Sequence, residues 1–142
     1  MWDATSGAAL ATLSGHSERV VAAAFSPDGA RILTSAFDNT AQLWDADTGA
    51  PLVTFKGHTD WVNGASFSPD GARVVTAGFD HTARLWKAET GEPIATLTGH
   101  NDRVIAAAFN QDGSRVVTAS ADRTARLWDG NSGAPISRSR QT

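Results

Sequence analysis

The chain has 142 residues, a formal net charge of −3 and no cysteine, which excludes disulfides and thiolate metal sites. The weak negative charge gives no reason to expect nucleic acid, because phosphate binding needs concentrated lysine and arginine. No apolar run has the length of a membrane span and the first residues lack the regions of a signal peptide, so we expect a cytoplasmic protein without membrane partners.

The sequence repeats itself with a period of 42 residues. Between residues 16–57 and 58–99, 23 of 42 positions are identical, so the copies must share one structure. A period of this length, sustained along the chain, indicates a modular array in which each copy packs against its neighbours. The pairs that mark the period are Gly15-His16, Gly57-His58, Gly99-His100, Leu43-Trp44, Leu85-Trp86 and Leu127-Trp128.

Within the first repeat, short apolar stretches alternate with turn signals. Proline and glycine in these turns supply the φ values that a tight turn needs. No stretch between the turns is long enough for a helix, and the stretches are rich in β-branched and aromatic residues. Each repeat is therefore predicted to form a four-stranded antiparallel meander, and the chain to be all-β. The stretches are 19–25, 31–36, 41–44 and 52–55, and the turns are 26–29, 38–40 and 47–49.

The Gly-His pair, the Ser-Pro-Asp-Gly turn and the closing Leu-Trp-Asp together resemble the WD40-repeat family along essentially the whole chain. The resemblance implies a β-propeller, in which each repeat supplies one four-stranded blade. It divides the chain into the end of a preceding blade (1–15) and three repeats (16–57, 58–99 and 100–142). The implied strands are 8–13, then 19–25, 31–36, 41–45 and 51–56, then 61–67, 73–78, 83–87 and 93–98, then 103–109, 115–120, 125–129 and 135–139.

By the same resemblance, the first strand of each repeat lies nearest the centre of the ring. The small residues at 22–24 suit that position, where neighbouring blades converge. Phe25, Phe67 and Phe109 end these strands. We expect all three phenylalanines to fill the space between adjacent blades.

Each repeat carries a histidine, a threonine, an aspartate and a tryptophan at fixed offsets, which invites comparison with a nucleophilic triad. An indole only donates and a carboxylate only accepts, whereas a hydroxyl and a neutral imidazole do both. A chain of hydrogen bonds in the order Trp to Thr to His to Asp therefore gives each inner member both a donor and an acceptor. In this chain the threonine hydroxyl is poorly placed to attack a substrate. We expect a structural network and no catalytic residue or enzyme activity. Its members are His16, Thr34, Asp38, Trp44, His58, Thr76, Asp80, Trp86, His100, Thr118, Asp122 and Trp128.

The remaining histidine, His81, stands in a turn where the other repeats carry Asn39 and Arg123. A metal site needs several converging ligands, and the Gly-His histidines belong to different blades. No phosphate-binding loop or dinucleotide fingerprint occurs. We therefore expect neither a metal nor a cofactor.

Recognition on a shared scaffold usually lies where exposed positions vary. Here the repeats differ in the loop before the first strand and in the turn before the third, which the resemblance places on one rim of the ring. Aromatic residues and arginine, the types enriched in interface hot spots, gather there. They either shield strand ends and touch the adjoining blade, or they bind an acidic or apolar peptide of a protein partner. The candidates are Arg19, Phe37, Trp61, Phe79, His81, Arg103 and Arg123.

Closed propellers have about 4–8 blades, whereas this chain carries three full repeats and one additional strand. The sequence alone favours a fragment of a longer propeller that serves as a noncatalytic scaffold for protein–protein interaction. Two further accounts are a ring built from two or three identical chains and a monomeric open arc. Two other functions stay open, a sensor or regulatory region of a larger multidomain enzyme and a module that assembles only with itself.

Overall fold

The computed structural model describes the backbone of residues 13–140 and the side chains of residues 13–136. This part of the chain forms three four-stranded antiparallel sheets, and it contains no helix that could cross a membrane. The first sheet comprises β1 (Val20–Phe25), β2 (Arg31–Ala36), β3 (Thr40–Asp45) and β4 (Pro51–Lys56). The second comprises β5 (Val62–Phe67), β6 (Arg73–Gly78), β7 (Ala83–Lys87) and β8 (Pro93–Leu97). The third comprises β9 (Val104–Phe109), β10 (Arg115–Ser120), β11 (Thr124–Asp129) and β12 (Pro135–Arg140).

Local sequence explains the tight connections between these strands. In the turn after β1, the amide of Gly29 donates to the carbonyl of Ser26 over 2.9 Å, and Gly29 adopts a φ of 73° that glycine accepts without strain. The Asp28 carboxylate accepts from the Ser26 hydroxyl at 2.6 Å and from the Ala30 amide at 2.9 Å. Such side-chain bonds to a turn backbone hold consecutive antiparallel strands together.

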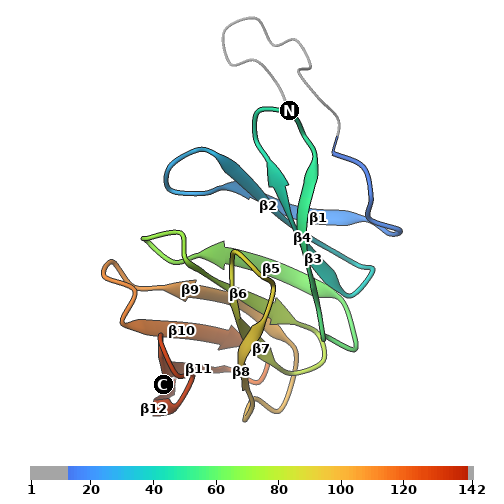
Figure 1. Cartoon of the computed structure of the whole chain (residues 1–142). Coiled ribbons are helices and arrows are strands. Elements are labelled where there is room, and N and C mark those ends of the chain that lie inside the picture. Colours follow the sequence, from blue (N-terminus) through green and yellow to red (C-terminus); the bar gives the residue numbers. More distant parts are fainter. Residues whose placement is uncertain (1–12, 141–142) are drawn as a thin grey trace, which may run out of the picture.

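The sheets pack face to face as blades, in the order of the chain (Figure 1). The innermost strands β1, β5 and β9 contact one another in sequence, and β4, β8 and β12 lie at the outer edges. Apolar side chains fill both spaces between blades. Those of the first space include Leu33, Leu43, Phe55, Val62, Val74 and Trp86, and those of the second include Val75, Leu85, Leu97, Val104, Val116 and Trp128. The all-β propeller architecture expected from the sequence is confirmed.

The predicted strands from residue 19 onward agree with the structure to within one residue at each end. The predicted strand over 8–13 lies outside the described residues apart from Leu13, which belongs to no strand. The sequence supports the outer strand of the third repeat less than it supports the other strands, and the structure shows this strand as β12.

The prediction for one of the three phenylalanines is wrong. Phe67 and Phe109 are partly buried and pack against the clusters between blades. Phe25, at the equivalent position of the first blade, is 64% exposed. Each of these rings faces the preceding blade, and none precedes the first one among the described residues.

Candidate functional site

A chain of hydrogen bonds joins the four recurring polar residues in the second blade. The His58 Nδ1 atom lies 2.9 Å from Asp80 Oδ2, and its Nε2 atom lies 2.6 Å from Thr76 Oγ1. The indole of Trp86 donates to the same Thr76 oxygen over 2.9 Å. Because an ionised carboxylate only accepts, Nδ1 donates to Asp80, and Nε2 of the neutral ring accepts from the threonine hydroxyl.

The other two blades hold the same arrangement. His16 lies 2.8 Å from both Asp38 and Thr34, and His100 lies 2.9 Å from Asp122 and 2.7 Å from Thr118. The three histidine side chains are at most 4% exposed. Trp44 and Trp128 donate to Thr34 and Thr118 over 2.8 and 2.9 Å. The structure thus brings together all twelve residues of the predicted network, four in each blade.

A fifth member of each network was missed by the sequence analysis. The hydroxyls of Thr40, Thr82 and Thr124 donate to the second oxygen of the network aspartate over 2.6, 2.7 and 2.5 Å. The signal was present, because a threonine follows two residues after the aspartate in every repeat. The residue between them has a positive φ of 71–73°, which brings the threonine back onto the carboxylate.

These hydrogen bonds control the charge of the aspartates. Burial raises the pKa of the Asp80 carboxyl, but hydrogen bonds from His58 and Thr82 outweigh it and hold this pKa well below its usual value. The pKa of Asp122 is lowered against the same burial effect, chiefly by Thr124 and the Asn101 amide. The backbone amides of Ser17, Thr59 and Asn101 each donate to such an aspartate, which ties the loop before the blade to the turn between its second and third strands.

On the same edge of the blades, aromatic side chains from successive blades form a ladder. Phe37 of the first blade stacks on Trp61 of the second, with ring centroids 3.8 Å apart and planes 13° from parallel. Trp61 meets Phe79 of its own blade at 5.6 Å. The guanidinium of Arg103, from the third blade, lies 5.0 Å from the centre of the Phe79 ring. We call Phe37, Trp61, Phe79 and Arg103 the rim ladder.

The backbone sets the spacing of this ladder. The Phe79 amide donates to the Trp61 carbonyl over 2.8 Å, and Phe37 pairs with Arg19 in the same way. Arg19, His81 and Arg123, the other predicted rim residues, are exposed. Among the described residues, none of these three stacks on the ladder or lies over one of its rings.

Comparison with known protein families identifies three successive repeats in this chain. The sequence model of the WD40 family, described as WD domain, G-beta repeat, matches residues 7–45, 49–87 and 91–129. The chain belongs to the WD40 family. The second and third matches begin just before the outer strand of one blade and end with the third strand of the next. No curated protein matches the sequence.

Many solved structures share this WD40 fold. A structure of U3-55K and a crystal structure of the RRP9 WD40 repeats both superpose with a TM-score of 0.86, at 23% sequence identity. Each comparison covers 91% of this chain and 41% of the other, so the chain spans about two fifths of the solved chains it matches. At this identity the likeness shows the fold. WD40 domains as a family mediate protein–protein interaction and are generally noncatalytic.

Two hollows are lined by described residues of this WD40 array, and neither gathers a catalytic set among them. One, of about 270 Å³, borders the first network, where Gln42 stands in place of Arg84 and Arg126. In the second blade, a methyl group added to Gly57 would lie 2.8 Å from the Arg84 guanidinium. The shorter glutamine does not reach the equivalent place in the first blade, so the space there stays open. The hollow therefore follows from one change of residue length beside the network.

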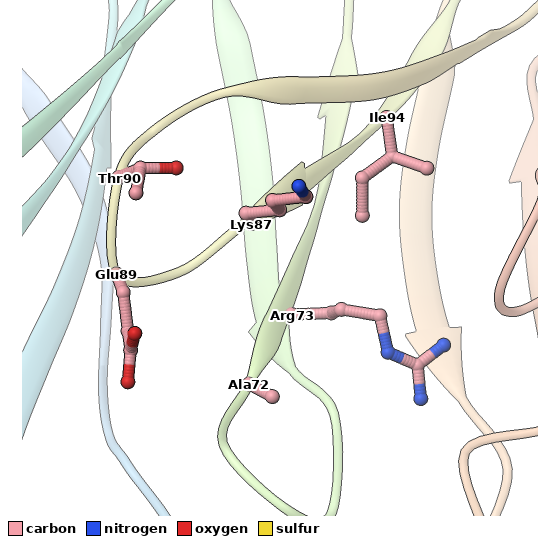
Figure 2. Close-up of a pocket in the computed structure, with 6 residues that line it drawn as sticks. All are labelled: Ala72, Arg73, Lys87, Glu89, Thr90 and Ile94. Atoms are coloured by element: carbon pink, nitrogen blue, oxygen red, sulfur yellow. The ribbon is translucent and has the colours of Figure 1, made fainter.

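The other hollow, of about 380 Å³, lies on the opposite edge of the second blade (Figure 2). Arg73 extends from it toward the third blade and away from Glu89. There its guanidinium donates to the carbonyls of Gly113 and Gly130, so it holds two blades together. Within the described residues, no three histidine, aspartate or glutamate side chains gather closely enough to hold a metal ion.

Proposed function

We propose that these WD40 repeats act as a noncatalytic scaffold whose rim ladder binds a protein partner. The partner segment would place an apolar side chain on Trp61 and an acidic side chain next to Arg103. The observation that carries the proposal is the rim ladder itself, in which aromatic rings of two blades expose Trp61 and end at a cation of the third blade.

Trp61 is the centre of this surface. It is 42% exposed, whereas Trp44, Trp86 and Trp128 are at most 2% exposed. Phe37 covers one face of the indole at stacking distance, so the ring is held in place before any partner arrives. A rigid aromatic side chain loses little conformational entropy on binding. Covering its exposed apolar area contributes about 25 cal/mol for each Å² before the costs of association are subtracted.

Arg103 supplies the preference for acidic segments. Its side chain is 54% exposed and lies 3.7 Å from Asp102, which is 48% exposed. An ion pair this exposed contributes about 0–1 kcal/mol, so a partner carboxylate can compete with Asp102 for the guanidinium. The guanidinium lies over the Phe79 ring, and its exposed side chain remains accessible to a partner carboxylate.

The network residues argue for a scaffold rather than an enzyme. Their side chains are buried, and every threonine oxygen already accepts an indole hydrogen. The aspartates are likewise occupied by the histidine, the second threonine and backbone amides. A nucleophile needs a substrate within reach, and a buried hydroxyl held between an indole and an imidazole offers no such approach.

The proposal is tested by selecting peptides from a random library displayed on phage. Wild-type protein should enrich segments that combine aspartate or glutamate with leucine, phenylalanine or tryptophan. Trp61→Ala should weaken the affinity for these peptides at least tenfold, measured by fluorescence polarisation. Arg103→Glu should abolish the preference for acidic residues while it leaves apolar selection in place.

Leu52→Ala provides the matched control, because Leu52 is 49% exposed and lies on the outer strand β4, away from the ladder. It should bind the selected peptides as the wild type does. Selected peptides that bind Trp61→Ala and the wild type with equal affinity would contradict the proposal. An enriched set without acidic residues would contradict the role of Arg103.

A further inference from the structure

The same contact joins the first blade to the second and the second to the third. The Arg31 guanidinium donates to the Gly71 carbonyl over 2.9 Å and lies 5.7 Å from the centre of the Phe67 ring. One period later, Arg73 donates to the Gly113 carbonyl over 3.2 Å and lies 5.1 Å from the Phe109 ring. The first and second blades thus each present an arginine to a glycine turn and a phenylalanine of the next blade.

The first blade carries the receiving half of this contact without an occupant among the described residues. Phe25, equivalent to Phe67 and Phe109, is 64% exposed. A methyl group built on Gly29 would meet no atom within 4 Å, whereas at Gly71 it would lie 3.4 Å from the Arg31 guanidinium. Val20, whose equivalents in the other blades are fully buried, is 46% exposed.

The third blade carries the presenting half. Arg115, the equivalent of Arg31 and Arg73, is exposed. Val117 is 42% exposed, whereas Leu33 and Val75 at the same position are at most 1% exposed. Figure 1 places the first and third blades at the two ends of the stack, so these halves cannot meet within one chain.

The two open halves match, nearly residue by residue, the two halves of the contact between the second and third blades. Strand β10 begins Arg-Val-Val-Thr-Ala, as does β6, which presents Arg73. Strand β1 reads Val-Val-Ala-Ala-Ala-Phe, and β9, which receives Arg73, differs from it only by an isoleucine at the second position. A contact between β10 of one copy and β1 of another therefore repeats the β6–β9 contact already present in the chain.

We propose that two copies of this chain join head to tail, with Arg115 of each copy seated on Phe25 and the Gly29 carbonyl of the other. Two such junctions close a ring of six blades, within the range of about 4–8 found in closed propellers. Each junction is a head-to-tail contact, and two such junctions close a ring when the three blades of each copy span half a turn. Whereas the sequence alone favours a fragment, the match between the two faces favours a second copy as the occupant.

Charge supports the same pairing. Arg73 lies close enough to Asp129 of the next blade to help lower the pKa of that carboxyl. The equivalent of Asp129 in the first blade is Asp45, an acid again, whereas the second blade has Lys87 there. Arg115 would therefore meet a carboxylate at the junction, as Arg73 does within the chain.

The test is the solution mass by light scattering on a sizing column. We expect the wild-type chain to have the mass of two copies. Arg115→Glu removes the cation and brings like charges together at Asp45, and Phe25→Arg opposes Arg115 with a second cation. Each variant alone should therefore have the mass of one chain. An equimolar mixture of the two should return to the mass of two, because one junction is then wild type and the other pairs glutamate with arginine.

Lys87→Glu is the control, since it makes the same charge reversal on a side chain that is 58% exposed on the middle blade. It should keep the mass of two copies. Both junction residues are exposed within one chain, so far-ultraviolet circular dichroism should show unchanged β structure in both variants. A wild-type mass of one or three chains, a polydisperse aggregate, or a mixture that stays at one chain would overturn the proposal. The contact uses no rim residue, so peptide binding is decided separately.

Discussion

At the scale of single residues, the network aspartate has more partners than any other member. Asp80 accepts hydrogen bonds from the His58 ring, the Thr82 hydroxyl and the amides of Thr59 and Thr82. An asparagine keeps one oxygen and turns an amide group toward one of these donors. A buried donor left without its acceptor costs about 1–3 kcal/mol.

Asp80→Asn is therefore expected to lower the free energy of unfolding by about 2 kcal/mol, measured by urea denaturation. The control is Asp60→Asn, since Asp60 is exposed and its carboxylate accepts from the Trp61 amide. Asp60→Asn should lower the free energy of unfolding clearly less than Asp80→Asn does. Equal losses in the two variants would contradict the importance assigned to the network.

The dependence of the free energy of unfolding on pH provides a second test of the role of Asp80. The folded-state pKa of Asp80 is lowered, so its ionised form stabilises the fold above the unfolded pKa of about 3.9. That stability is lost as pH falls from this value through the folded pKa. Asp122 and Asp38 behave in the same way. The difference in the free energy of unfolding between the wild type and Asp80→Asn, measured by urea denaturation at several pH values, should therefore shrink as pH falls below about 3.9.

At the scale of the element, the first strand of each blade carries a phenylalanine whose environment depends on its neighbour. Phe67 packs in the space between the first two blades and beneath Arg31. Phe67→Ala is expected to lower the free energy of unfolding by about 2 kcal/mol, less than for a fully buried ring. Phe25→Ala should lower the free energy of unfolding by only a few tenths of the loss expected for Phe67→Ala, because the Phe25 ring is 64% exposed.

This comparison needs chains that do not associate, so both substitutions are measured in the Arg115→Glu background by urea denaturation. There the proposed junction is absent and only packing within one chain contributes. Similar losses for the two alanine variants would show that the first blade buries its phenylalanine in solution. That result would contradict the open face described for β1.

The strands themselves follow from local chemistry, which is why they are predictable. Prolines, glycines and aspartates in the turns fix where each strand ends, and the matched donors and acceptors fix the members of the network. The Phe37–Trp61 stack is different, since it joins two repeats whose relative rotation no local pattern contains. The exposure of Phe25 is different again, because a period shows which positions are equivalent but not which copies have a neighbour.

At the scale of the whole molecule, the two proposals place binding and assembly on separate surfaces. One edge of the blades carries the rim ladder, which leaves a cation and an aromatic ring open to a partner. The end faces of the first and third blades carry the two halves of the contact that already joins the blades. The proposed binding and the proposed assembly therefore involve different residues, and a variant of one surface should leave the other intact.

The most direct test of binding at the rim is the fluorescence of Trp61 itself. Its contribution is obtained as the spectrum of the wild type minus that of Trp61→Phe, in which the other four tryptophans cancel. Addition of a selected acidic, apolar peptide should shift this difference spectrum to shorter wavelength, because the partner removes the indole from water. A peptide that binds both proteins and leaves the difference spectrum unchanged would contradict the account.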